Sequence, residues 1–321
     1  MQAVKTRIGP PNAETIAEAA RILRAGGLVA FPTETVYGLG ADATNAEAVA
    51  RLYAAKGRPV FNPLIAHVRD TASARALAVF DAAAERLAAA FWPGPLTLVL
   101  PQRPGCPVAA LATAGLDTIA LRVPANSVAQ ALLRSFGGPV VAPSANLSGH
   151  VSPTTAQHVA ADLDGRIDLI IDGGPTEVGL ESTIVACLDG QAALLRPGGL
   201  PRGRLEAALG GPLASPPRRV GEAPAAPGQL ASHYAPRARL RLEAVDVRPN
   251  EALLAFGPAP PRAAMLNLSA KGDLVEAAAN LFSYLRKLDA SGAPTIAVMP
   301  IPQEGLGEAI NDRLRRAAAP R

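Results

Sequence analysis

The 321-residue sequence has few cysteines, few aromatic side chains and little lysine. Its two cysteines, Cys106 and Cys187, form no C-x-x-C pair, which argues against a disulfide framework and against a cysteine-ligated zinc site. Aromatic residues make up 4% of the chain and the formal net charge is +4. No basic stripe interleaved with aromatic residues is present, so the sequence does not predict a nucleic-acid-binding surface.

The sequence also lacks a hydrophobic run of the length that spans a membrane. Its first residues, MQAVKTRIGPP, contain no apolar core and do not resemble a signal peptide. We therefore expect a cytoplasmic protein with no membrane partner. With 49% hydrophobic and 18% charged residues, the chain can bury a sizeable core and is long enough for two domains.

Short apolar runs alternate with alanine-rich helical patterns over the first 200 residues, which predicts an α/β fold. The expected strands are Leu28–Phe31, Leu64–Val68, Leu96–Leu100, Ile119–Val123, Val140–Ala142, Leu169–Ile171 and Thr183–Cys187. The expected helices are Asn45–Lys56, with Asn45 as N-cap, Ala72–Phe80, Ala82–Phe91, Ser127–Phe136 and Thr155–Leu163.

The composition changes around residues 211–230, GPLASPPRRVGEAPAAPGQL, which are rich in Pro, Gly and Ala without a period. Such a composition is typical of a linker. We expect a first domain over residues 1–208, a linker over 209–236 and a second, smaller α/β domain over 237–321. The strands expected there are Leu240–Val245, Ala252–Phe256, Ala264–Leu268 and Thr295–Met299, with helices at Leu274–Leu288 and Leu306–Ala318.

The stretch FPTETVYGLGADA, residues 31–43, ends on a G-x-G-x-x-A pattern that is similar to the dinucleotide-binding fingerprint. In that motif the first glycine follows the strand directly and the motif opens a helix. Here PTETVY intervenes, and the next helix begins near Asn45. The window Gly57–Ala66 contains no Asp or Glu to bind a ribose. We therefore reject this site and expect Gly38 and Gly40 in a turn that requires positive φ.

Four further stretches place polar side chains at predicted strand ends, where ligands of open α/β sheets bind. AAKGRPVFNPLIAHV carries Lys56, Arg58 and Asn62 in a loop before a strand that contains His67. Two cations two residues apart suit a polyphosphate, and no other lysine lies between residues 5 and 271. The alternatives are a solvated helix end for the cations and a hydrogen-bonded core residue for His67.

In DTIALRVPAN, Thr118 and Arg122 lie on one face of a strand. An arginine in so apolar a strand requires an anion, because a buried unpaired charge is costly. The residues leave open whether that anion is a ligand or a structural carboxylate.

VVAPSANLSGHVSPTTAQHV follows a strand with Ser144, Asn146 and Ser152, whose hydroxyl and amide groups can donate to phosphate. Ser152 or Thr154 is expected to cap the next helix, whose N-terminus is itself a site for anions.

GLESTIV and LLRPGG add Ser182 and Arg196 to the predicted strand ends. No pair of carboxylates suggests a glycosidase, no G-x-S-x-G occurs, and the four histidines show no metal-binding spacing. The residues therefore predict a site for a nucleotide or other polyanion, with phosphoryl or nucleotidyl chemistry by positioning and charge neutralisation.

Lys56-x-Arg58 and Ser144-x-Asn146, together with FPTETVYGLG, NPL, FWPGPLTLVL, LRVPAN and GLESTIV, resemble the YrdC-like threonylcarbamoyl-AMP synthases. PGQLASHYAPR, NLS, GDLVEAAANLFSYLRKLD and GLGEAINDRLRRAA resemble the long, two-domain form of that family, so the resemblance covers nearly the whole chain. It implies an open, twisted mixed sheet in a catalytic domain over residues 1–208 and a Rossmann-like α/β domain over 237–321.

The resemblance implies that L-threonine, bicarbonate and ATP give L-threonylcarbamoyl-adenylate and pyrophosphate, with Mg²⁺ accompanying ATP. The product would pass to a tRNA-modifying threonylcarbamoyltransferase that forms N6-threonylcarbamoyladenosine, and stable tRNA binding to this chain is not expected. A double-stranded RNA-binding or ribosome-assembly protein is the alternative, and a different carboxylate adenylyltransferase is the enzymatic one. The hydrogenase-maturation carbamoyltransferases carry a similar domain but also zinc-finger cysteines, which this sequence lacks.

The resemblance also implies site residues. L-threonine would be held by Thr35, His67, Arg122, Ser182 and the backbone at Ala142. ATP would be held by Lys56, Arg58, Asn62, Thr118, Ser144, Asn146, Ser152, Arg196 and Tyr234, with Lys56 and Arg58 as the catalytic pair. Thr33 and Glu34 either join the site or only shape the turn.

Residues 227–236, PGQLASHYAP, combine turn residues with Leu, His and Tyr, which a plain spacer does not need. We expect this lid segment to close over the site with Tyr234 against the nucleotide, because an adenylate must be shielded from water. The alternative is an ordinary contact between domains.

Overall fold

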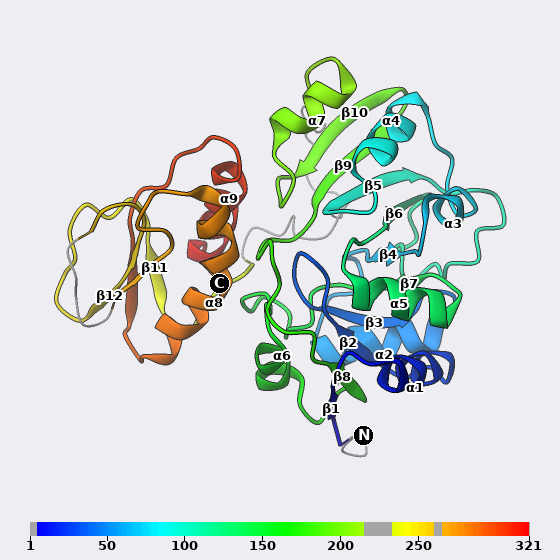
Figure 1. Ribbon diagram of the computed structural model, residues 1–321, viewed down its shortest axis with the longest axis horizontal. Coiled ribbons are helices and arrows are strands. Elements are labelled where there is room, and N and C mark those ends of the chain that lie inside the picture. Colours follow the sequence, from blue (N-terminus) through cyan, green and yellow to red (C-terminus); the bar gives the residue numbers. More distant parts are fainter. Residues whose placement is uncertain (1–4, 215–232, 260–264, 321) are drawn as a thin grey trace.

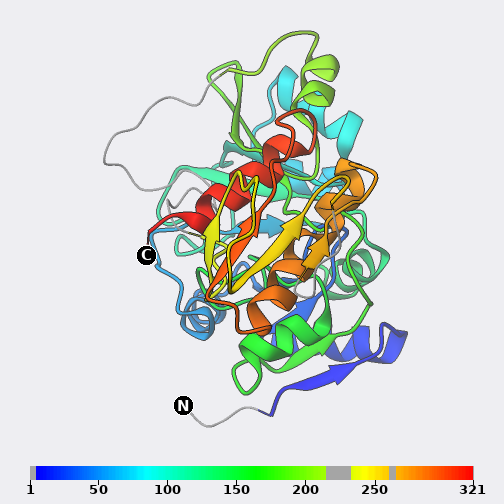
Figure 2. The same ribbon diagram turned by 90° about the vertical axis from the view of Figure 1, so that its left-hand side faces the viewer.

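The computed structural model of the protein describes residues 5–214, 233–259 and 265–320. They form a larger and a smaller α/β unit, which lie side by side in Figure 1; in Figure 2 the smaller unit faces the viewer in front of the larger one. The larger unit contains a ten-stranded sheet and the smaller unit a four-stranded one. Both are α/β, as the sequence predicts.

The larger sheet is open and mixed, with strands in the order β1-β8-β2-β3-β7-β4-β6-β5-β9-β10. Four neighbouring pairs are parallel, namely β1/β8, β2/β8, β4/β6 and β5/β9, and the others are antiparallel. The strands are β1 (Arg7–Gly9), β2 (Val29–Phe31), β3 (Gly38–Asp42), β4 (Ile65–His67), β5 (Leu96–Pro101), β6 (Thr118–Arg122), β7 (Val140–Val141), β8 (Leu169–Ile171), β9 (Thr183–Leu188) and β10 (Gln191–Arg196). The seven strands predicted here from the sequence are all present, each end within one residue of its predicted position.

The helices of the larger unit are α1 (Ala13–Arg24), α2 (Ala46–Lys56), α3 (Thr71–Arg75), α4 (Ala82–Phe91), α5 (Ser127–Phe136), α6 (Ala156–Leu163) and α7 (Arg202–Leu209). The predicted cap of α2 is confirmed: Asn45 accepts from the backbone N–H groups of Glu47 and Ala48. The helix predicted over 72–80 is wrong beyond Arg75. There the N–H of Val79 donates to Pro101 at the end of β5 (2.9 Å), so the chain joins the sheet edge instead.

The two glycines of the fingerprint-like motif lie in strand β3, and the prediction of a positive-φ turn was wrong. A Cβ atom on Gly40 would lie 2.9 Å from Phe31 Cε1 and 3.1 Å from Val140 Cγ1, and one on Gly38 would lie 3.1 Å from Ala142 Cβ. Glycine is required here because side chains of the two neighbouring strands cover the backbone closely.

The smaller unit has a parallel sheet in the order β11-β14-β12-β13. Its elements are β11 (Arg239–Arg241), β12 (Glu251–Ala255), β13 (Met265–Asn267), α8 (Leu274–Ala290), β14 (Thr295–Val298) and α9 (Gly307–Ala318). Strand β11 ends earlier than predicted because Glu243, at φ 53°, leaves the β region. Figure 1 shows α8 and α9 on the side of this sheet that faces the larger unit.

The two units share one hydrophobic cluster. Val36, Val151 and Leu180 of the larger unit pack with Tyr234 and with side chains of α8 and α9. At the start of the predicted linker, the N–H of Ala214 still donates to Ala192 of β10 (2.9 Å). Within the described part of the chain, no helix is long and apolar enough to cross a bilayer.

Candidate active site

A cavity lies at one edge of the larger sheet, where β2, β4, β6 and β7 end and β9 begins. Most of the predicted site residues line it, from both the threonine set and the ATP set: Thr35, Arg58, His67, Arg122, Ala142, Ser144, Ser182, Arg196 and Tyr234. Its volume is about 40 Å³, far below the several hundred Å³ that a nucleotide-sized ligand occupies. The enclosing residues must therefore shift to admit ATP.

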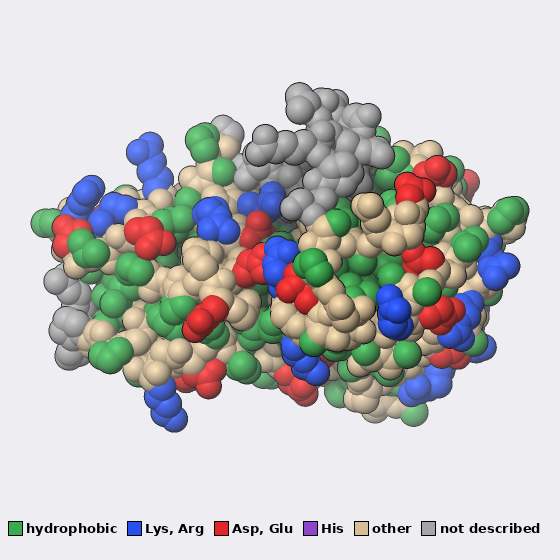
Figure 3. Space-filling view, turned by 90° about the horizontal axis from the view of Figure 1, so that it is seen from above, with side chains coloured by type: hydrophobic (Ala, Val, Ile, Leu, Met, Phe, Trp, Pro, Cys, Tyr) green, Lys and Arg blue, Asp and Glu red, His purple; other side chains and the backbone are tan. Residues whose placement is uncertain are grey.

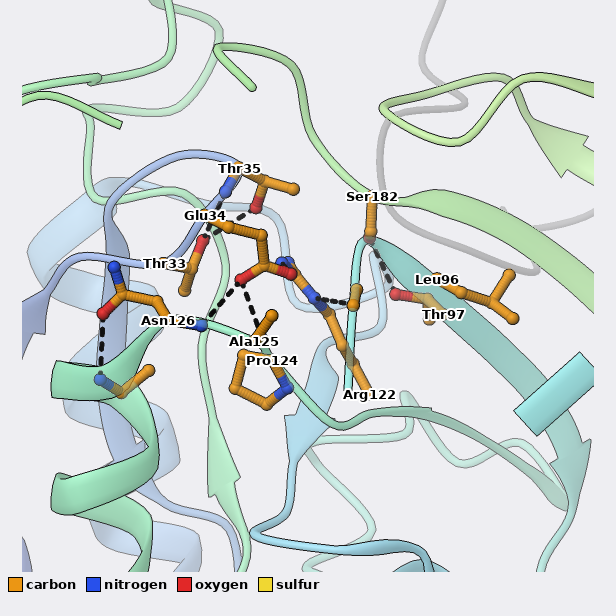
Figure 4. Close-up of polar contacts among 12 residues, drawn as sticks. Thr33, Glu34, Thr35, Leu96, Thr97, Arg122, Pro124, Ala125, Asn126 and Ser182 are labelled. Atoms are coloured by element: carbon orange, nitrogen blue, oxygen red, sulfur yellow. Dashed lines mark hydrogen bonds and ion pairs between the residues drawn. The ribbon is translucent and has the colours of Figure 1, made fainter. Parts of the chain in front are cut away.

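The loop after β2 presents two oriented threonine hydroxyls to this edge (Figure 4). Thr33 Oγ1 donates to the Val36 carbonyl (2.7 Å) and lies 2.7 Å from Thr35 Oγ1. Because the Thr33 hydroxyl proton is used on Val36, the Thr35 hydroxyl is the donor between the two threonines. Thr35 Oγ1 can therefore still accept a hydrogen bond from a ligand.

Arg122 is paired with a structural carboxylate. For the anion that it requires, the sequence left a ligand and a structural carboxylate as the two alternatives. Its Nη2 lies 2.7 Å from Glu34 Oε1, and both side chains are more than 90% buried. Glu34 Oε2 in turn accepts from the N–H of Ala125 (3.1 Å), just before α5, so Glu34 does more than shape its turn. Arg122 also lines the cavity, and a substrate carboxylate there would share the guanidinium with Glu34.

His67, the last residue of β4, is a neutral imidazole. Burial, and next the charge of Arg122, lower its pKa to about 3. Its Nδ1 lies 3.2 Å from the Ile65 carbonyl, and its ring meets Phe31 edge-on at 6.4 Å. His67 therefore supplies a hydrogen bond or a packing surface to the cavity, and no charge.

Ser182, directly before β9, is held by contacts to two other strands. Its Oγ lies 2.7 Å from Thr97 Oγ1 of β5 (Figure 4), and its carbonyl accepts from Arg196 Nη2 (2.8 Å). The N–H of Ala142 donates to Ile65 (3.0 Å), so a substrate contact at Ala142 would come through its carbonyl. These contacts connect residues of, or next to, five strands (β4, β5, β7, β9 and β10) around one small polar pocket.

Lys56 is the last residue of α2, and its side chain does not line the cavity. Its Nζ donates to the backbone carbonyls of Ser144 and Asn146, and the side chain is 2% exposed. Burial, and next the charge of Arg58, hold the pKa of Lys56 well below its usual value. Lys56 thus ties the end of α2 to the loop after β7.

Arg58 and Arg196 bring two further cations to the same place. Burial lowers the pKa of Arg58 to about 10 and also lowers that of Arg196. Arg58 donates to the carbonyls of Asn62 and Pro63 (3.3 and 3.0 Å). Lowered pKa values at adjacent buried cations indicate a site that an anionic ligand would stabilise.

Two buried amide oxygens nearby, Asn62 Oδ1 and Asn146 Oδ1, have no hydrogen-bond partner among the described residues. Buried polar atoms without partners are rare in folded proteins and often mark a ligand or water position. The Asn146 Nδ2, by contrast, donates to Leu147 and His150 (2.8 and 2.9 Å).

Ser152 does not cap a helix, and neither does Thr154; both capping predictions were wrong. The cap of α6 is Thr155, whose side chain accepts from the His158 N–H. Ser152 lies too far upstream, and its hydroxyl instead donates to Glu181 Oε1 (2.5 Å). Ser152 is therefore connected to the cavity through Glu181, which lines it.

Of residues 227–236, the described part begins at His233, and it contributes His233 and Tyr234 to the lining of the cavity. Tyr234 is 1% exposed and stacks on Phe282 of α8 at 5.7 Å, and the Ala235 N–H donates to Gly149 (2.8 Å). Tyr234 adopts φ 63°, a conformation that strains a non-glycine residue. The part of the lid segment before His233 lies outside the described residues.

The cavity gathers nine of the fourteen predicted side chains or backbone groups. Four predicted residues do not line the cavity but lie close behind it. Ser152 contacts Glu181, Lys56 contacts the Asn146 carbonyl, and the Asn62 carbonyl accepts from Arg58. Thr118 stands at the opposite end of β6 from Arg122 and does not line the cavity.

Sequence reasoning missed three contributors. Thr97, from FWPGPLTLVL, orients Ser182; the acid of GLESTIV, Glu181, lines the cavity together with His233. A signal existed for Glu181, because it is the one charged residue of GLESTIV and lies just before a buried strand, where a carboxylate is expected to be paired.

Comparison with known proteins matches both units. A family model described as telomere recombination (Sua5_yciO_yrdC) matches residues 21–198, and one described as the threonylcarbamoyl-AMP synthase C-terminal domain matches residues 201–319. The threonylcarbamoyl-AMP synthase of Bacillus subtilis is 42% identical over 334 residues, 97% of this chain and 94% of the relative. That of Pyrococcus abyssi is 42% identical over 318 residues, 94% of this chain and 93% of the relative.

Solved structures agree with this match. The crystal structure of P. abyssi Sua5 complexed with L-threonine has a TM-score of 0.88 at 39% identity and covers 98% of this chain and 97% of its own. Escherichia coli YciO, with a TM-score of 0.55 at 27% identity, covers 62% of this chain and 96% of its own. The chain therefore belongs to the threonylcarbamoyl-AMP synthase family, in the form that carries the additional C-terminal domain.

Proposed function

We propose that this chain makes L-threonylcarbamoyl-adenylate and pyrophosphate from L-threonine, bicarbonate and ATP. The observation that carries the proposal is that hydrogen-bonding groups around the Arg122–Glu34 ion pair and two further buried arginines share one small cavity. Arg122, His67 and Ser182 lie on its walls together with Arg58 and Arg196. A reaction that joins an amino acid to a nucleotide requires both kinds of subsite side by side.

The amino-acid half is the pocket around Arg122. The guanidinium would pair with the threonine carboxylate, and Glu34 on its other side fixes its orientation. The oriented hydroxyls of Thr35 and Ser182 would pair with the substrate hydroxyl. Neutral His67 adds no positive charge next to the substrate amine, which must be unprotonated to react.

The chemistry balances in two steps. The threonine amine attacks the carbon of bicarbonate, a C–N bond forms and water leaves, which gives the carbamate. A carbamate oxygen then bonds to the α-phosphorus of ATP, and the bond from that phosphorus to the bridging oxygen of pyrophosphate breaks. Charge on the phosphate oxygens would be offset by Arg58, Arg196 and, through the loop it holds, Lys56.

Mg²⁺ would arrive with ATP. Among the described residues no group of three acidic, histidine or cysteine side chains is placed to hold a metal ion, and Glu34 and Glu181 are each paired with an arginine. Mg²⁺ often binds chiefly through substrate phosphates and water. When bound it would offset phosphate charge, and no step above depends on a protein ligand to it.

The lid segment and the fate of the product complete the proposal. Tyr234 would move aside to admit ATP and return over the adenylate, which its burial in the present arrangement supports.

The adenylate would then pass to a tRNA-modifying threonylcarbamoyltransferase. On the face drawn in Figure 3, basic and acidic side chains are interspersed instead of forming a basic stripe, which favours a product handed over without stable tRNA binding.

Pyrophosphate release from ATP tests the proposal. The full chain is assayed with L-threonine and bicarbonate together, and with each omitted in turn. We expect release to require both, and to be matched by a threonine-containing adenylate in the products. Release that is independent of threonine would refute the proposal, and tight binding of double-stranded RNA without release would favour the alternative function.

A further inference from the structure

Arg313 of α9 is a cation of the C-terminal domain that is wholly buried against the catalytic domain. Its side chain is 0% exposed. Its Nε donates to Glu181 Oε2 (2.7 Å), its Nη2 to the Pro197 carbonyl (3.0 Å) and its Nη1 to Asp312 (2.6 Å). All three guanidinium nitrogens are thus used. A buried ion pair is a poor device for stability alone, because desolvation cancels most of its attraction.

The same guanidinium contacts the lid segment. Arg313 Cζ, the central carbon of the guanidinium, lies 5.1 Å from the centre of the Tyr234 ring, which is a cation–π geometry. Tyr234 also stacks on Phe282 of α8. Arg313 therefore contacts the closing aromatic residue and the cavity wall at once.

The partner that matters most is Glu181. Its two carboxylate oxygens are divided between Arg313 and the Ser152 hydroxyl, and the residue lines the cavity beside Arg58 and Arg196. Burial alone would raise the pKa of Glu181, but the charges of Arg313 and Arg196 hold it below its usual value. An ionised carboxylate thus stands next to the cations proposed to bind phosphate, and Arg313 neutralises it.

We propose that Arg313 is a positioning residue for ATP binding, which neutralises and orients Glu181 beside the phosphate-binding cations and seats Tyr234 over them. The inference rests on the proposed function for the identity of the ligand. It makes the C-terminal domain a part of the active site, because the cavity wall keeps its charge balance only when α9 is docked.

The physical consequence is selective. Without Arg313 the charge of Glu181 repels the phosphates of ATP and competes for Arg196. The threonine pocket lies around Arg122, whose carboxylate partner is Glu34, and it does not depend on this pair. Loss of Arg313 should therefore weaken ATP binding more than threonine binding. If Arg313 only linked the two domains, its loss would lower stability and would change both affinities to the same extent.

The test uses the full chain with Arg313→Leu, Glu181→Gln and the double variant. The exposed Arg315→Leu on the same helix is the matched control. Affinities for Mg²⁺-ATP and for L-threonine are measured separately by calorimetry, well below the unfolding temperature of each variant. Binding of ATP is read without turnover, so a failure of the positioning role is distinguishable from a failure of the proposed reaction.

We expect Arg313→Leu to weaken ATP binding by about tenfold or more, with threonine affinity within about threefold. The added Glu181→Gln should restore most of the ATP affinity, because the uncompensated charge is gone, even if the melting temperature stays low. If Arg313→Leu does not fold, Arg313→Gln serves in its place, because an amide removes the charge that neutralises Glu181 but can still donate a hydrogen bond there. Equal losses for both ligands, or no recovery in the double variant, would overturn the proposal.

Discussion

The carboxylate of Glu34 and the guanidinium of Arg122 form a buried ion pair, with 2.7 Å between Oε1 and Nη2. Glu34 comes from the loop after β2 and Arg122 from the end of β6, two strands that β3, β7 and β4 separate in the sheet. The pair therefore links two sides of the pocket that is proposed to hold threonine. It also fixes which part of the guanidinium is left for a substrate carboxylate.

The first prediction concerns Arg122→Lys. An ammonium keeps the charge but cannot meet Glu34 and a substrate carboxylate in two directions at once, so the KM for L-threonine should rise by about tenfold or more. The KM for ATP should change little. The measurement is steady-state pyrophosphate release, with the exposed Arg86→Lys as control. An unchanged KM for threonine would show that Arg122 is occupied by Glu34 alone.

The second prediction concerns Lys56→Met. The sequence analysis assigns Lys56 to ATP binding, and the structure places its ammonium on the carbonyls of Ser144 and Asn146. We expect pyrophosphate release to fall by about a hundredfold or more. The free energy of unfolding should also fall by about 1–3 kcal/mol, because two carbonyls lose their donor.

Turnover and urea unfolding of the same preparation check this pair of effects, with the exposed Lys271→Met as reference. Near-normal turnover in Lys56→Met would make Lys56 a structural helix-end residue and nothing more.

The third prediction concerns choice of the amino acid. The hydroxyls of Thr35 and Ser182 are each oriented by a neighbouring threonine, Thr33 and Thr97. A site built to pair a substrate hydroxyl rejects an analogue that lacks it by about a thousandfold or more in kcat/KM. Valine should therefore be a very poor substrate, and serine the nearest competitor. Comparable activity with valine would remove these hydroxyls from contact with the substrate side chain.

The fourth prediction concerns pH and His67. Its pKa is lowered to about 3 in the folded chain, against about 6.5 when unfolded. Below pH 6.5 the unfolded state takes up a proton that the folded state does not, so acidification from 6.5 towards 3 destabilises the fold. At pH 5.5 this one group costs about 1.4 kcal/mol relative to pH 7.5.

His67→Gln should accordingly lose less stability than the parent chain between pH 7.5 and 5.5, as measured by urea unfolding at both values. Arg86→Gln, at an exposed side chain that does not titrate between these pH values, serves as the control and should follow the parent. An identical slope for the His67 variant and the parent would mean that His67 is not held neutral.

The sequence predicts seven strands of the larger sheet, because each of these is a short apolar run bounded by Gly, Pro or polar residues. Strands β1, β3 and β10 were not predicted, and β3 shows why. Gly38 and Gly40 read locally as a turn, and the reason for them, the approach of Phe31 and Val140, comes from two other strands. Local sequence patterns do not predict an element whose residues are selected by contacts with other strands.

The site shows the same division. Strand-end polar residues such as Arg122, Ser144 and Ser182 were predictable, since strand ends in α/β sheets meet at common edges. Partners were not predictable, because the Glu181–Arg313 contact spans 132 residues and two domains. The sequence could state that a buried arginine needs an anion, but it could not say which carboxylate would supply it.

The shared cluster of Val36, Val151 and Leu180 with Tyr234 and the helices α8 and α9 has a consequence for cooperativity. Val36 directly follows Thr35, so the apolar surface that holds the two units together is continuous with the loop that forms the threonine pocket. Separation of the units would uncover that surface and loosen the pocket in one event. We therefore expect the two units to unfold in one transition, although they contain separate sheets. The smaller unit would stabilise the conformation of the loop that carries Thr35 in the larger one.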